Sequence, residues 1–293
     1  MPPTHRPGAA ALWMTGSIGG FCLMAIAARA LGQDLDTFEI MLYRSIIGVL
    51  VVTAAATYTG RLAEISTSHF GLHFLRNSFH FAGQNLWLFA LTLIPLAQLF
   101  ALEFSYHILV ALAAPVILGE RLTPARAAAA AVGFVGILIV ARPFGAGGLS
   151  LGLGAAVFCA VGFAGAALAT KRLTRHASIT CILFWLTAMQ TGMGLICASW
   201  DGHIALPSVT GLPWILAIGL SGLGAHFCIT KALSLAPASI VTPIDFFRLP
   251  LIAVIGMAFY AEPFDLWVFV GAAAILAANW YNLRMKEATR MPQ

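Results

Sequence analysis

Long apolar stretches alternate with short polar or Pro/Gly-containing connections along the whole chain. Each stretch is about 20 residues long, the length of an α-helix that crosses a lipid bilayer. Ten such helices are predicted, at residues 9–30, 37–58, 71–92, 96–118, 124–141, 150–170, 179–199, 211–231, 238–260 and 265–284. The connections are too short for a soluble domain, so the pattern predicts an all-α membrane protein.

The second half of the chain repeats the first. Residues 90–95 (ALTLIP) recur as residues 232–237 (ALSLAP), and this offset of 142 also carries Glu103 onto Asp245 without a gap. Membrane transporters commonly contain internal repeats and place the substrate site at the repeat interface. Each unit holds five helices, an odd number, so the second unit must enter the bilayer in the opposite sense. We therefore predict two inverted five-helix repeats, residues 1–145 and 146–293.

The composition fits lipid as the outer solvent. Of the 293 residues, 60% are hydrophobic and 9% are charged, whereas soluble domains carry about 25% charged residues. Cytoplasmic connections of membrane proteins hold most of the lysines and arginines. This bias predicts a multi-pass protein of the cell inner (plasma) membrane with both termini in the cytoplasm. In that orientation, Arg29 and Arg142 are the only lysines or arginines in the outer connections. The net charge of +5 includes no basic cluster typical of nucleic-acid binding.

Motifs for catalysis and metal binding do not stand out. The five cysteines lie in apolar stretches without CxxC spacing, which favours buried thiols over disulfides or metal ligands. No P-loop, HExxH or GxGD motif is present. Residues 219–222 match the GxSG pattern of rhomboid proteases, but the last histidine, His226, lies on the same predicted helix, whereas that dyad needs one from a later helix. We predict neither an enzyme nor a cofactor.

Ionisable residues lie deep inside two repeat-equivalent helices. Glu103 and His107 are four residues apart, and Asp245 and Arg248 are three apart, so each pair shares a helical face. Tyr106 adds a hydroxyl nearby. Charges at this depth are costly and need a partner or a wet cavity. One hypothesis is a substrate or proton site, because an acid with a histidine exchanges protons near neutral pH; the other is a set of structural ion pairs.

The third predicted helix is unusually polar. It carries Asn77, His80, Gln84 and Asn85, and Gln84 maps onto His226 in the second half. Amides and imidazoles at this depth suit an uncharged polar or heterocyclic ligand. Hydrogen bonds between helices are the alternative.

Two further side chains belong to the candidate site. Arg44 lies about eight residues from the outer end of its helix, too deep to reach the interface easily. It is predicted to face an acid or an anionic group of the substrate. Trp87 lies deep in the third helix, where stacking on a ring of the substrate and packing in the core are both open.

Several short motifs resemble the EamA-type members of the drug/metabolite transporter superfamily. The segment 38–44 (FEIMLYR) resembles the second-helix pattern of that family, and residues 119–122 (GERL) resemble its turn between helices four and five. Ala129 departs from a common glycine. The segment 242–248 (TPIDFFR) resembles bacterial carriers of S-adenosylmethionine and riboflavin. Within these motifs, Glu120 and its mate Glu262 are interpreted as cap and loop residues that maintain the fold.

This resemblance implies a secondary transporter that moves a small organic metabolite by alternating access. A membrane receptor or scaffold is the alternative outside transport, and an intramembrane hydrolase is a weaker one. The sequence leaves open the cargo (S-adenosylmethionine, riboflavin, an amino acid or another metabolite), the direction, coupling to protons, and whether the protein is a monomer or a homodimer.

Overall fold

The computed structural model of the protein describes residues 6–31, 34–118, 124–142, 150–236, 241 and 244–288. The helices are α1 (Pro7–Leu31), α2 (Thr37–Tyr58), the 3-10 helix η1 (Leu62–Glu64), α3 (Phe70–Leu93), α4 (Leu96–Glu103), α5 (Tyr106–Leu118), α6 (Pro124–Ala141), α7 (Leu151–Leu173), α8 (Ile179–Ala198), α9 (Leu212–Leu235), α11 (Arg248–Tyr260) and α12 (Leu266–Ala288). The described part of the chain holds no strand. The fold is therefore all-α, as predicted.

The helices are long and apolar enough for a membrane protein. Within the described residues, six segments could cross a bilayer by length and composition alone, and shorter apolar helices accompany them. Polar residues mark several helix starts. Asp36 and Glu39 form a capping box at α2, while Ser150 and Ser178 cap α7 and α8 with their hydroxyls. The helix boundaries thus follow the polar punctuation of the sequence closely.

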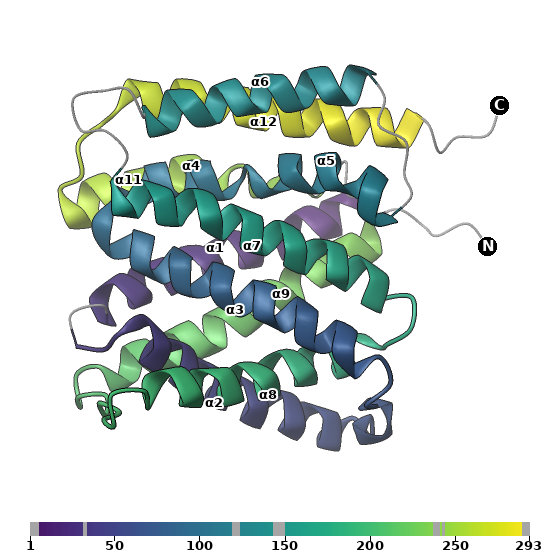
Figure 1. Ribbon diagram of the computed structural model, residues 1–293, viewed down its shortest axis with the longest axis vertical. Helices are drawn as coiled ribbons and strands as arrows, with labels where there is room; N and C mark the ends of the chain where they lie inside the picture. Colours follow the sequence, from purple (N-terminus) through teal and green to yellow (C-terminus); the bar gives the residue numbers. More distant parts are fainter. Residues whose placement is uncertain are drawn as a thin grey trace.

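The helices lie side by side in stacked layers (Figure 1). One end of the long axis is the pair α6 and α12, and the other end is the pair α2 and α8. Between them, α1 packs on α9 and α3 packs on α7. Each of these pairs joins one helix from either half of the chain, so the two halves are interleaved and the core forms between them.

Glycines allow the closest helix pairs. A Cβ atom at Gly162 would lie 2.7 Å from the Cα of Gly83, where α7 meets α3. A Cβ atom at Gly136 would lie 2.7 Å from the carbonyl oxygen of Gly271, where α6 meets α12. Backbones this close gain dispersion energy, which matters in lipid because the hydrophobic effect does not drive helices together there.

The predicted helix 96–118 is broken in the structure. Helix α4 ends at Glu103 and α5 begins at Tyr106. The hydroxyl of Ser105 donates to the carbonyl of Leu102 (2.6 Å), and Asn279 Nδ2 of α12 donates to the carbonyl of Phe104 (3.0 Å). A side chain that bonds the backbone locally competes with the helical ladder, and α12 satisfies the carbonyl that the break exposes.

The second half shows a break at the equivalent place. Phe246 and Phe247 form a turn before α11 starts at Arg248. The offset of 142 carries Phe104 onto Phe246, so each break follows directly after an acid, Glu103 or Asp245. The predicted helix 238–260 is described only in part, and the motif at residues 119–122, with Glu120, lies outside the described residues.

Candidate functional site

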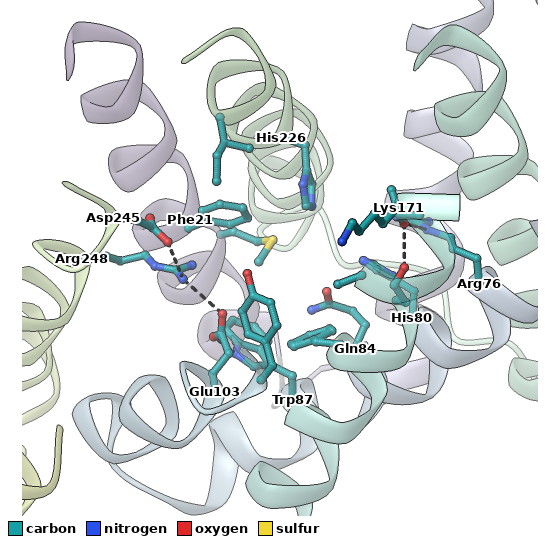
Figure 2. A pocket seen from close by; sticks show the side chains of 17 residues that line it. Phe21, Arg76, His80, Gln84, Trp87, Glu103, Lys171, His226, Asp245 and Arg248 are labelled. Carbon is teal, nitrogen blue, oxygen red and sulfur yellow. Dashed lines mark hydrogen bonds and ion pairs between the residues drawn. The ribbon is translucent and has the colours of Figure 1, made fainter. Parts of the chain in front are cut away.

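A buried ion triad joins the two broken segments. Arg248 Nη2 lies 3.2 Å from Glu103 Oε1 and 3.3 Å from Asp245 Oδ2 (Figure 2). All three residues are less than 10% exposed. Of the two pairings the sequence suggested, Asp245 with Arg248 is present, whereas Glu103 pairs with Arg248 from the other half instead of with His107. The triad therefore ties one repeat to the other.

Aromatic rings surround the triad. The guanidinium carbon of Arg248 lies 4.7, 5.1 and 4.8 Å from the ring centroids of Phe21, Phe100 and Phe104. Cation–π attraction of this kind strengthens when water is excluded. Trp87 Nε1 donates to Glu103 Oε2 at 2.8 Å. Rings and an indole N–H thus replace part of the hydration that these charges lose.

A central cavity opens beside the triad. Its volume is about 410 Å³, within the range of about 300–1,000 Å³ for small-molecule sites. Eight of the twelve residues predicted for the site line it: Glu103, Asp245, Arg248, Tyr106, His80, Gln84, Trp87 and His226. The structure therefore brings both acids and the polar face of α3 together around one space.

Two cations that were not predicted as site residues lie at one end of the cavity. Arg76 near the start of α3 and Lys171 near the end of α7 both line the cavity (Figure 2). Arg76 Nε donates to Thr170 Oγ1 at 3.1 Å. The sequence contains a signal for Arg76, because Arg76, His80 and Gln84 are four residues apart and so share one face of the helix. The cavity therefore runs from the centre of the molecule to the ends of α3 and α7.

Arg29 and Glu262 form an ion pair, here called the latch, at the C-terminal end of α3, whereas Arg76 lies near the start of that helix. Arg29 forms an ion pair with Glu262 and donates to the carbonyls of Leu91 (2.6 Å) and Ile94 (2.7 Å). Glu262 also accepts from the backbone N–H of Leu96 at 2.9 Å, at the start of α4. Glu262 is thus a cap residue, as interpreted from the sequence, but it also links α1, α3 and α4 to the loop before α12.

Four of the predicted residues do not line the central cavity. His107 is not among the residues that line the cavity. The helix breaks between it and Glu103, so the four-residue spacing no longer sets a common face. Its ring lies against Tyr106, with centroids 3.9 Å apart. Arg44 lines a separate cavity of about 20 Å³ with Gln190 and His226, and donates to the sulfur of Met41 at 3.7 Å.

The other two predicted amides outside the cavity bond to backbone carbonyls. Asn77 Nδ2 donates to Trp185 O at 3.0 Å, and Asn85 Nδ2 donates to Phe81 O at 2.8 Å. His80 lines the cavity, and its Nδ1 also lies 2.7 Å from Gln190 Nε2 of α8. Within the described residues, no group of three or more His, Cys, Asp or Glu could hold a metal ion.

Comparison with known proteins adds the family. The model of the EamA-like transporter family matches residues 9–142 and again residues 149–283. A riboflavin transporter of Brucella anthropi is 32% identical over 244 residues, covering 82% of this chain and 86% of the relative. An S-adenosylmethionine uptake transporter of Rickettsia prowazekii is 25% identical over 273 residues, covering 92% and 90%. A solved crystal structure aligns with a TM-score of 0.67 at 19% identity, covering 97% of this chain and 99% of its own, which supports the fold alone.

Proposed function

The chain belongs to the EamA-like transporter family, and we propose that it is a secondary carrier of the bacterial inner membrane whose first candidate cargo is riboflavin. It is a multi-pass membrane transporter of a small metabolite. The observation that supports this proposal most is the central cavity at two broken helices from opposite halves, with an ion triad that joins those halves. Transporters place their substrates at such discontinuous helices.

The helix pairs support an inverted repeat of residues 1–145 and 146–293. Repeat-equivalent helices α2 and α8 pack on one another, and they run in opposite directions in Figure 1. A Cβ atom at Gly48 would meet Thr187, and one at Gly194 would meet Leu42, so rising numbers on one helix meet falling numbers on the other. Helices α6 and α12 are related in the same way. Antiparallel contact between equivalents is the arrangement that a two-fold axis in the membrane plane produces.

The two ends of the molecule differ in a way that supports alternating access. The cavity extends toward Arg76 and Lys171, whereas Arg29 and Glu262 join the halves at the other end. Lysine and arginine collect on the side of Arg76 and Lys171, which is therefore the cytoplasmic side under the positive-inside rule. We infer an inward-facing conformation with both termini in the cytoplasm.

The lining favours a planar, polar cargo. Rings of Phe21, Trp87, Tyr106 and Phe163 share the cavity wall with the amide of Gln84, and aromatic rings favour stacked or edge-on contact with other rings. Riboflavin combines a planar ring system with carbonyls, an imide N–H and hydroxyls. The relatives named for riboflavin include one that is 32% identical, whereas those named for S-adenosylmethionine are 24–26% identical.

Transport by the purified protein tests this function. In proteoliposomes preloaded with riboflavin, we expect counterflow of labelled riboflavin above that of protein-free liposomes, and competition by excess unlabelled riboflavin. A pH gradient imposed in either direction tests coupling to protons. Binding without counterflow of riboflavin or S-adenosylmethionine would favour the receptor alternative, and neither binding nor counterflow would exclude both cargoes.

A further inference from the structure

The cavity wall contains buried polar atoms that the protein itself does not satisfy. Among the described residues, Gln84 Nε2, Asp245 Oδ1 and Arg248 Nε lack a hydrogen-bond partner, and all three side chains line the cavity. Gln84 is 5% exposed and Asp245 is 6% exposed. A buried donor or acceptor without a partner lowers the stability of the fold. Neighbouring protein atoms cover these atoms, so a ligand in the cavity reaches them only when the side chains turn toward it.

The two acids of the triad are not equivalent in this respect. Both oxygens of Glu103 have partners, Arg248 at 3.2 Å and the indole N–H of Trp87 at 2.8 Å. Asp245 uses only Oδ2, which accepts from Arg248 at 3.3 Å, and its Oδ1 has no partner. Glu103 is therefore an anchor for the triad and for Trp87, and Asp245 is the acid with an acceptor to spare.

The unpaired nitrogen of Arg248 differs from the other two atoms. It belongs to a cation that already binds both acids and lies among three phenyl rings. Two unpaired atoms thus remain for hydrogen bonds to a ligand: the amide donor Gln84 Nε2 and the carboxylate acceptor Asp245 Oδ1. Figure 2 shows them on opposite sides of the cavity, Gln84 on α3 and Asp245 beside the break before α11.

We propose that Gln84 and Asp245 determine specificity: Gln84 donates to a carbonyl oxygen or ring nitrogen of a planar heterocycle, and Asp245 accepts from an N–H or O–H of the same molecule. This inference rests on the proposed function, because the two residues would bind the transported cargo in the central cavity. It excludes a ligand that offers only acceptors or only apolar surface. Trp87, held by its bond to Glu103, gives the ring system a fixed aromatic neighbour.

Binding of riboflavin to the detergent-purified protein tests the role of Gln84. The variant Gln84→Met keeps the length of the side chain and removes the donor. We expect its dissociation constant for riboflavin to rise about tenfold, the effect of one lost hydrogen bond. The matched control is Gln98→Met, because Gln98 Nε2 already donates to Val140 O at 3.0 Å and lies outside the central cavity. This control is expected to change the dissociation constant less than twofold.

Two riboflavin analogues test the role of Asp245. N3-methylriboflavin lacks the imide N–H, and tetraacetylriboflavin lacks free hydroxyls, so wild-type protein should bind at least one of them more weakly than riboflavin. In Asp245→Leu, Arg248 keeps Glu103 as its partner, and the preference for riboflavin should disappear. In the control Asp265→Leu, which removes an acid outside the central cavity, the preference should persist. An unchanged preference in Asp245→Leu would overturn the proposal.

A measurement without ligand separates this inference from the identity of the cargo. Gln84→Met removes an unsatisfied donor, so the melting temperature of the free protein should be equal to or higher than that of wild type, whereas Gln98→Met should lower it. If Gln84→Met lowers it as much as Gln98→Met does, Gln84 has a partner inside the protein and the proposal fails. If wild type does not bind riboflavin but Gln84→Met is stabilised, riboflavin is the wrong cargo and the assignment of Gln84 is supported.

Discussion

At the scale of single residues, Arg248 compensates two buried acids at once. Its guanidinium contacts Glu103 and Asp245, and all three side chains are buried. Removal of one partner from a buried ionic group costs about 3–5 kcal/mol, because the other charges stay buried without compensation. We therefore expect Arg248→Met to lower the melting temperature and the yield of monodisperse protein sharply.

Neutralisation of the whole triad should restore much of that loss. In the triple variant Arg248→Met, Glu103→Gln, Asp245→Asn, no charge is left buried without compensation, so the cost of an unpaired buried charge is removed. Size-exclusion chromatography and thermal unfolding of wild type, Arg248→Met and the triple variant measure this. A triple variant as unstable as Arg248→Met would show that packing of the arginine, and not its charge, stabilises the site.

His107 shows the limit of spacing rules for single residues. The sequence places it four residues after Glu103, but the helix is broken at residues 104 and 105, and His107 is not among the residues that line the cavity. We expect His107→Ala to change riboflavin affinity less than twofold, whereas Tyr106→Ala, which alters the cavity wall, should weaken it. Titration of flavin binding checks both variants. A loss in His107→Ala as large as that in Tyr106→Ala would place the imidazole in the binding site.

At the scale of elements, the sequence predicted most helix boundaries but not the breaks. Apolar length and polar caps identify α2, α7 and α8 within a few residues. The break after Glu103 involves no glycine or proline; it depends on Ser105 bonding its own backbone and on Asn279 of α12 reaching the exposed carbonyl. A contact between positions 175 residues apart leaves no local signal. Glu103 and Asp245 could still be predicted as site residues, because a charge at membrane depth is costly whether or not the helix is broken there.

The latch of Arg29 and Glu262 also depends on distant residues, and it predicts how one end of the carrier opens. Its side chains are 16% and 11% exposed, whereas those of the neighbouring pair Arg142 and Asp265 are 45% and 33% exposed. Exposed pairs contribute roughly 0–1 kcal/mol, so the more buried pair should control opening. We expect Glu262→Gln to speed amide hydrogen exchange at Leu96 about tenfold.

The exposed pair provides the control for this experiment. Asp265→Asn should leave exchange at Leu96 nearly unchanged, because that backbone N–H bonds to Glu262 and not to Asp265. Hydrogen-exchange mass spectrometry of peptides that cover residues 88–96 measures both variants. Equal acceleration in the two variants would mean that this end opens by general loosening and not through the latch.

At the scale of the whole molecule, the relation between the two halves accounts for which helices pack together. Under the offset of 142, α1 on α9 maps onto α7 on α3, while α2 on α8 and α6 on α12 map onto themselves. In the sequence, the repeated segment and the odd number of helices predict an inverted relation between the halves, and these contacts support it. The sequence could not indicate which end is closed, because Arg29 and its repeat mate Lys171 are both cations. Only the structure shows that Arg29 belongs to the latch and that Lys171 lines the cavity.

The sense of the two repeats in the membrane is the last prediction, and two equivalent positions test it. Arg61, in the connection after α2, maps onto His203, in the connection after α8, and both are exposed. In a variant without the native cysteines, we expect a membrane-impermeant thiol reagent applied to intact cells to label His203→Cys and to label Arg61→Cys only after permeabilisation. Parallel repeats would place both cysteines on one side. Labelling of both from outside would therefore contradict the inverted arrangement, and with it the rocking of two opposed halves about the central cavity.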